Sequence, residues 1–204
     1  MAIILLAAPL TAAPVTVLAL GDSLTAGLGL PPDQGLVPQL QQWLAARGQE
    51  VTVINAGVSG DTTAGGLARL DWSLTPEVDA LIVNLGGNDL LRGLPPAAAR
   101  ANLDAILAKA ESRHLPVLLV RQVAPGNYGA DYKAEFDAIY PELAASHGAL
   151  LSEVYFQPLT DPATGMVDPA FLQADGLHPT AEGVARILEV LGPQVLALLA
   201  LLPS

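Results

Sequence analysis

The chain has 204 residues, 51% of them hydrophobic and 14% charged, and its 20 acidic residues outnumber 9 basic ones for a formal net charge of −11. This apolar content excludes an intrinsically disordered chain, and the length suits one domain with a sizeable core. So few basic residues argue against a nucleic-acid partner. With no cysteine there is no disulfide, thiolate nucleophile or Cys-ligated zinc, so any catalytic nucleophile must be an oxygen or an amine.

The first 21 residues carry no charge. Pro9 and Pro14 argue against a membrane-spanning helix there. Residues 15–20 instead predict a buried strand, which opens a single domain over residues 14–204. The apolar segment 1–13 resembles the end of a secretory signal peptide without its basic start, so it is either a trimmed signal peptide or a simple tail. We expect a periplasmic or secreted protein, with a cytoplasmic location as the alternative.

Short apolar runs alternate with helix-length stretches along the rest of the chain. Runs that are apolar throughout indicate strands buried on both faces, as in a parallel sheet covered by helices. The predicted strands span residues 15–20, 51–55, 80–84, 116–120 and 149–151. The predicted helices span residues 37–47, 62–72, 97–113 and 131–146, and the apolar run 195–202 predicts a final helix. The simplest architecture is a three-layer α/β/α sandwich with a five-stranded parallel sheet.

Four polar clusters carry candidate chemistry, and the first, Gly21-Asp22-Ser23-Leu24, directly follows the first predicted strand. In open parallel sheets, ligands bind at the carboxyl ends of the strands. A serine there would lie beside a helix N-terminus, whose backbone N–H groups favour a developing anion. Taken alone, Asp-Ser more often marks an ordinary turn or helix cap, and Thr25 departs from the G-x-S-x-G elbow of α/β-hydrolases.

The second cluster, near the C-terminus, is Asp175-Gly-Leu-His178. At this spacing in a tight turn, the carboxylate can accept from one imidazole nitrogen and leave the other free as a base. The other two histidines, His114 and His147, fall where a predicted helix ends, a place that the helix dipole favours for a cation. Elimination therefore favours His178, although an isolated Asp-x-x-His motif is weak evidence.

The third and fourth clusters, Ser59-Gly60-Asp61 and Gly86-Gly87-Asn88-Asp89, follow the second and third predicted strands. Glycine allows a close backbone approach, and the neutral amide of Asn88 can donate to an oxyanion without bringing a charge. Each cluster alone is more often a glycine loop capped by Asp or Asn. Together, the four clusters supply a nucleophile, oxyanion donors, a base and its orienting carboxylate at one edge of one sheet.

In these residues the sequence resembles the SGNH, or GDSL-type, hydrolases, whose four blocks are matched by Gly21-Asp-Ser-Leu24, Gly60, Gly87-Asn88-Asp89 and Asp175-x-x-His178. It is most similar to the branch that contains bacterial thioesterase I, lysophospholipase L1 and arylesterase. The resemblance implies a flavodoxin-like fold and a serine hydrolase without metal or cofactor. It also implies Ser23 as nucleophile, His178 as base and Asp175 as its orienting residue. The implied oxyanion hole consists of the Ser23 and Gly60 N–H groups and the Asn88 side chain.

Apolar loops beside the expected site predict an acyl groove, although such residues can equally belong to the core. The candidate substrate-binding residues are Leu90, Leu91, Ala124, Pro125 and Tyr128. We expect a monomeric esterase or thioesterase acting on acyl-CoA, lysophospholipids, or aryl and short-to-medium-chain esters. The alternatives are a carbohydrate O-acetyl esterase of the same fold and a non-catalytic lipid- or glycan-binding relative. A nucleotide-binding protein with a similar sheet is disfavoured because no phosphate-binding glycine motif follows a strand.

Overall fold

The computed structural model describes residues 14–203, which contain a five-stranded sheet whose neighbouring strands all pair in parallel. Its spatial order is β2-β1-β3-β4-β5. The strands are β1 (Val15–Gly21), β2 (Val51–Gly57), β3 (Ala80–Asn84), β4 (Val117–Arg121) and β5 (Leu150–Val154). The predicted parallel sheet is thereby confirmed. The predicted signal-peptide remnant, residues 1–13, lies outside the described part of the chain.

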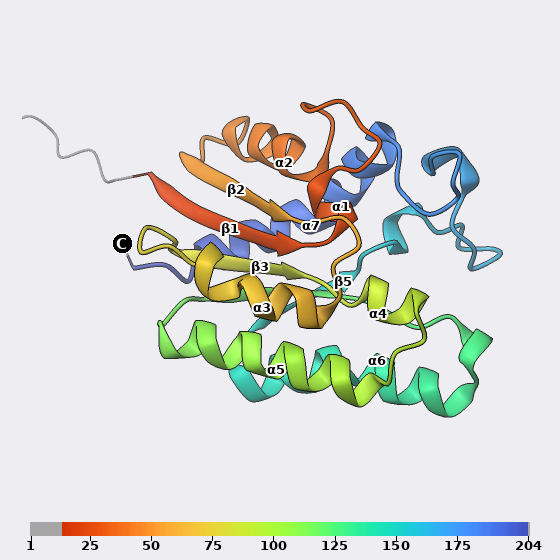
Figure 1. Cartoon of the computed structure of the whole chain (residues 1–204). Helices are drawn as coiled ribbons and strands as arrows, with labels where there is room; N and C mark the ends of the chain where they lie inside the picture. Colours follow the sequence, from red (N-terminus) through yellow and green to blue (C-terminus); the bar gives the residue numbers. More distant parts are fainter. Residues whose placement is uncertain (1–13, 204) are drawn as a thin grey trace, which may run out of the picture.

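Helices cover both faces of this sheet and complete the predicted α/β/α sandwich (Figure 1). One layer consists of α2 (Leu36–Ala45) and α7 (Ala181–Leu199), and the other of α3 (Thr63–Ser73), α5 (Pro96–Ser112) and α6 (Ala130–His147). The short helices α1 (Ser23–Ala26) and α4 (Gly87–Leu91) lie just beyond the ends of β1 and β3. Three 3-10 turns lie in the later loops: η1 (Gly126–Tyr128), η2 (Gln157–Leu159) and η3 (Pro169–Phe171).

The first four residues of the central strand β3 are apolar because both of its faces are buried. Successive side chains of a strand point to opposite faces of the sheet. Leu81 and Val83 pack in the core beneath α3, α5 and α6, whereas Ala80 and Ile82 pack in the core beneath α2 and α7. Because every residue of β3 is buried, neither face of the strand tolerates a charged residue.

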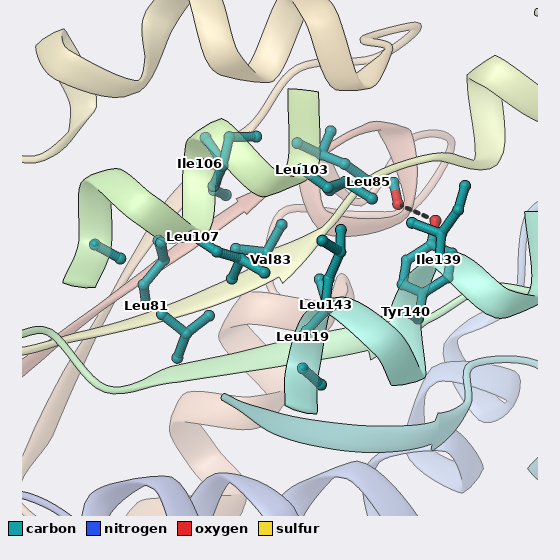
Figure 2. Packing of buried hydrophobic residues seen from close by; sticks show 14 of the residues in the cluster. Leu81, Val83, Leu85, Leu103, Ile106, Leu107, Leu119, Ile139, Tyr140 and Leu143 are labelled. Atoms are coloured by element: carbon teal, nitrogen blue, oxygen red, sulfur yellow. Dashed lines mark hydrogen bonds between the residues drawn. The ribbon is translucent and has the colours of Figure 1, made fainter. Parts of the chain in front are cut away.

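One buried tyrosine connects this core to the loop after β3. Figure 2 shows Tyr140 of α6 beside Leu85, and its hydroxyl donates a 2.9 Å hydrogen bond to the Leu85 carbonyl oxygen. The next residue, Gly86, has φ +111°, and a Cβ there would lie 2.0 Å from the Tyr140 hydroxyl oxygen. Only glycine fits this position. The core thus fixes the backbone from which α4 and Asn88 begin.

The prediction of a final helix at 195–202 is wrong about where that helix begins and ends. Helix α7 begins at Ala181, after the cap residue Thr180, and continues through Gly192 and Pro193 to Leu199. A Cβ at Gly192 would lie 2.7 Å from the Trp43 ring, so the glycine allows α2 and α7 to pack closely. Tertiary packing therefore maintains a helix that the Gly-Pro pair would interrupt in isolation.

The fifth strand is also longer than the predicted 149–151, since β5 continues to Val154. Ser152 in its centre is buried, and its hydroxyl accepts a 2.9 Å hydrogen bond from the Arg121 N–H. This bond lies where the pairing register of β4 and β5 shifts, so a polar side chain completes the strand pairing there. Among residues 14–203, no helix is long and apolar enough to cross a bilayer.

Candidate active site

Ser23, His178 and Asp175 meet at the carboxyl edge of the sheet. Ser23 is the first residue of α1, directly beyond β1, and the other two residues belong to the turn that precedes α7. Ser23 Oγ lies 2.8 Å from His178 Nε2, and His178 Nδ1 lies 2.7 Å from Asp175 Oδ2. The structure therefore joins the three residues singled out in the sequence in one continuous chain of hydrogen bonds.

The turn that carries His178 is held by the same carboxylate that contacts its ring. Asp175 Oδ1 accepts hydrogen bonds from the N–H groups of Leu177 and His178, at 2.9 and 3.0 Å. Hydrogen bonds from the His178 N–H, then from the His178 ring and from the Leu177 N–H, lower the pKa of Asp175 to about 2. An ionised carboxylate beside Nδ1 requires the proton on that nitrogen, so Nε2 is left as an acceptor for the Ser23 hydroxyl.

Asp22 is a buried carboxyl group that the sequence did not single out. It caps α1 by accepting from the Leu24 N–H at 3.0 Å, and its other oxygen accepts from Asn88 Nδ2 at 3.3 Å. Only 3% of Asp22 is exposed, and this burial raises its pKa to about 6. Asp22 thus ties together the helix that presents Ser23 and the side chain of Asn88. Its position next to Ser23 in the first cluster was the available sequence signal.

Three potential oxyanion donors meet at Ser23: its own N–H at the start of α1, the Gly60 N–H in the loop after β2, and the Asn88 side chain on α4. Within residues 14–203, neither the Ser23 nor the Gly60 N–H donates a hydrogen bond to a protein group. Asn88 Nδ2 carries two N–H bonds, of which Asp22 accepts one. Gly60 has φ +84°, and its carbonyl oxygen accepts a 2.6 Å hydrogen bond from the Arg92 guanidinium. Arg92 thereby links the loop after β2 to α4.

A cleft of about 270 Å³ opens over Ser23 and His178. Four of the five predicted substrate-binding residues line it: Leu90, Leu91, Pro125 and Tyr128. Ser23 and Asn88 also belong to its lining, whereas Gly60 does not. Further lining residues, which are not among the five predicted substrate-binding residues, are Leu24, Gln122, Val123, Asn127, Phe156 and Leu177. The sequence positions of three of these residues point to the cleft, because Gln122 and Val123 directly follow β4 and Leu177 precedes His178.

Ala124, the fifth predicted substrate-binding residue, does not line the cleft. Its side chain is 2% exposed and packs in the core beneath α5 and α6. Its N–H donates to Asp137 Oδ1 and its carbonyl oxygen accepts from Lys133 Nζ, both at 2.7 Å. These bonds to α6 fix the segment so that Val123 and Pro125 line the cleft and Ala124 does not.

His147 binds two carboxylates at a distance from this cleft. It is the last residue of α6, and its Nε2 lies 2.9 Å from Asp104 Oδ1 while its Nδ1 lies 3.1 Å from Glu111 Oε2. Carboxylates only accept hydrogen bonds, so both ring nitrogens must carry protons to satisfy both contacts. The hydrogen bonds to Asp104 and then Glu111 raise the pKa of His147 above its ordinary value. This arrangement clamps α6 to α5 and agrees with a structural role.

The His147 clamp predicts a pH-dependent stability. Because the pKa is higher in the folded state, the stabilisation is fully present below the unfolded value of about 6.5 and is lost as pH rises through the folded value. Thermal melts of the parent and His147→Gln should differ in Tm at about pH 5.5 and converge by about pH 9. His114→Asn is the control, and the difference between its Tm and that of the parent should not disappear as the pH rises. A Tm difference that stays constant with pH would contradict the clamp.

A parallel sheet with a serine, a histidine and an aspartate joined at its carboxyl edge is an arrangement of the serine hydrolases. Residues 19–186 match the GDSL-like Lipase/Acylhydrolase family, and the chain belongs to this family. It is 42% identical to Esterase TesA of Pseudomonas aeruginosa, over 92% of this chain and 91% of that protein. It is 33% identical to Thioesterase 1/protease 1/lysophospholipase L1 of Escherichia coli strain K12, over 90% of this chain and 85% of that protein. The crystal structure of AlinE4, an SGNH-hydrolase family esterase, is similar with a TM-score of 0.75 and 42% identity, over 95% of this chain and 100% of that chain.

Proposed function

We propose that this hydrolase cleaves carboxylic esters and thioesters through an acyl-enzyme on Ser23. The observation that carries the proposal is the 2.8 Å contact between Ser23 Oγ and His178 Nε2, with Asp175 on the other ring nitrogen. A nucleophile, a base within hydrogen-bond reach and a group that orients the base are the components that acyl transfer requires.

The first half of the reaction forms the acyl-enzyme. His178 Nε2 takes the proton of the Ser23 hydroxyl as Oγ attacks the acyl carbonyl carbon. The carbonyl oxygen becomes an oxyanion, for which the Ser23 N–H, the Gly60 N–H and Asn88 Nδ2 are the proposed donors. The tetrahedral intermediate then collapses, the bond to the leaving alcohol or thiol breaks, and His178 gives its proton to the leaving group.

The second half releases the acid. Water enters, His178 takes one of its protons, and the resulting oxygen nucleophile attacks the acyl carbon bound to Ser23. Collapse of the second intermediate returns the proton to Ser23 Oγ and frees the carboxylic acid. Throughout, Asp175 stabilises the imidazolium because its carboxylate stays ionised with a pKa of about 2.

The cleft favours small apolar acyl groups. We propose that Leu90, Leu91, Pro125 and Tyr128, which line it, contact the acyl or aryl part of the substrate. A net charge of −11 gives no long-range attraction for anionic acyl-CoA, so uncharged or zwitterionic esters suit the protein better. We also retain the proposals of a single domain over residues 14–204, a monomer, and a periplasmic or secreted location with a cytoplasmic one as the alternative.

p-Nitrophenyl esters of graded chain length test the proposed activity. We expect saturable hydrolysis with the highest kcat/KM for short to medium acyl chains, because the cleft is small. Acetylated oligosaccharides, assayed in parallel, test the carbohydrate esterase alternative. If no ester of any length is hydrolysed while a labelled lipid or glycan still binds, the non-catalytic alternative is correct.

Asp175→Asn should lower kcat by about a thousandfold or more while leaving the turn folded. Asparagine keeps an oxygen that accepts from the Leu177 and His178 N–H groups but loses the charge that stabilises the imidazolium. KM should change little. Asp168→Asn is a matched control, because Asp168 caps η3 in the preceding loop through the Ala170 N–H and does not contact the imidazole. Parental kcat in Asp175→Asn would refute the assigned role.

A further inference from the structure

Apart from Met166, which lies in the loop between η2 and η3, five large apolar side chains that stay exposed lie at the carboxyl edge of the sheet. Their exposed fractions range from 42% to 57%. They come from five separate segments: the loop after α1, the loop after β2, the end of α4, the turn η1 and the turn before α7. We call Leu28, Val58, Leu91, Tyr128 and Leu177 the apolar rim.

Hydrogen bonds join the segments that carry the apolar rim. Arg92, next to Leu91, donates to Gly60 in the Val58 loop, and the Tyr128 hydroxyl donates to the Leu91 carbonyl oxygen at 3.4 Å. On the other side, Gln173 Nε2 donates to the Leu28 carbonyl oxygen at 2.9 Å, while the Gln173 N–H donates to the His178 carbonyl oxygen. Three rim residues, Leu91, Tyr128 and Leu177, also line the cleft over Ser23. The rim therefore borders the cleft mouth.

We propose that the apolar rim docks this enzyme on a zwitterionic lipid surface, from which a single-chain ester enters the cleft. The proposal rests on the ester hydrolysis proposed above and assigns its substrate class as amphiphilic esters held in a lipid surface. Exposed apolar side chains around a cleft insert into the boundary between headgroups and acyl chains, with a strength that follows the apolar area buried. A second copy of the chain or a protein partner on the same rim would instead cover the mouth through which substrate must pass.

Charge selects the kind of lipid. Exposed carboxylates lie at the same edge of the sheet, in loops at Asp33, Asp161, Asp168 and Asp175 and in the first turn of α6 at Asp131. Together with the net charge of −11, they repel a surface of anionic lipids. A phosphocholine headgroup carries no net charge and presents an ammonium group to these carboxylates. The lipid surface that fits is therefore zwitterionic.

The test measures vesicle binding apart from catalysis. Ser23→Ala protein is floated with phosphatidylcholine vesicles, with vesicles rich in phosphatidylglycerol, and alone. We expect binding to phosphatidylcholine and weaker binding to the anionic vesicles. In the same background, Leu28→Ser/Val58→Ser should weaken binding about tenfold, because these two rim residues lie outside the cleft lining.

A double variant at the opposite end of the molecule is the matched control. Trp72, in the last turns of α3, and Leu201, just beyond α7, are 87% and 54% exposed. Trp72→Ser/Leu201→Ser removes more exposed apolar area than the rim variant does and should still leave vesicle binding unchanged. With an intact Ser23, the rim variant should keep parental rates on a soluble short-chain ester and lose rate on lysophosphatidylcholine micelles.

Several outcomes would overturn the docking proposal: no flotation with phosphatidylcholine, equal binding by the parent and the rim variant, or preference for anionic vesicles. Rim-dependent self-association without vesicle binding would instead identify an interface between copies. Vesicle binding by the Ser23→Ala protein, combined with no hydrolysis of any soluble ester by the parent, would refute the catalytic proposal and leave the docking intact.

Discussion

Replacing Ser23 with alanine is expected to lower kcat on a soluble p-nitrophenyl ester by about four to six orders of magnitude. The hydroxyl is the proposed attacking group, and without it His178 can only activate water in a site arranged for Ser23 Oγ. The substitution removes one oxygen at a residue that is 9% exposed, so the fold and the cleft should persist. An unchanged Tm and retained substrate binding would show that the chemistry alone was lost.

Covalent labelling with a phosphonate ester that carries a good leaving group tests the same prediction. The parent should gain one adduct on the Ser23 peptide by mass spectrometry, and Ser23→Ala should gain none. Ser59→Ala is the control, since Ser59 is the serine in the loop after β2 and does not contact His178. That variant should keep the adduct and its activity within a few-fold. An adduct on another residue, or near-parental turnover by Ser23→Ala, would refute the nucleophile assignment.

Much of the fold was predictable because burial on both faces leaves a direct signal in the sequence. The apolar run 80–83 with the following Asn84 predicted β3 with its observed bounds, since every residue of that strand is buried. Ser23 and Asn88 were also predictable as neighbours, because the carboxyl ends of parallel strands meet at one edge, whereas His178 precedes α7 and was linked to the site by its motif. The four motif blocks specified this arrangement more sharply than periodicity did.

The remaining features depend on contacts between residues far apart in the sequence. The length of α7 depends on packing between Gly192 and Trp43, and the direction of Ala124 depends on Lys133 and Asp137 of α6. Neither partner can be inferred from local propensity, because each pairing exists only once the layers have assembled. The prediction for Leu90 and Leu91 on the short helix α4 differs in outcome, because both residues do line the cleft.

The link between Asp22 and Asn88 is a feature of the same kind. A carboxylate beside a proposed oxyanion donor was not expected, since its charge opposes a developing anion. In the structure that carboxyl group caps α1 by accepting from the Leu24 N–H, and it also accepts from one N–H of the Asn88 amide. The amide is therefore fixed in orientation, and its second N–H stays available for the oxyanion. Preorganisation of a donor in this way is what allows it to act in the transition state without reorganisation.

Asn88→Ala is accordingly expected to lower kcat by about two to three orders of magnitude with little change in KM. The lost donor acts on the oxyanion, which exists only in the transition state and the tetrahedral intermediates, so ground-state binding should be nearly unaffected. Asn127→Ala is the matched control, because Asn127 is an amide in the same cleft on a different loop. It should keep kcat within a few-fold.

Measuring Tm together with kcat separates the loss of an oxyanion donor from a loss of structure. Asn88 also donates to the buried Asp22, so Asn88→Ala should lower Tm as well as kcat. Asp22→Asn removes the buried charge and keeps an oxygen that can accept from Asn88, so it should retain far more activity than Asn88→Ala. If Asn88→Ala raises KM and leaves kcat at the parental value, Asn88 binds substrate in the ground state and is not an oxyanion donor.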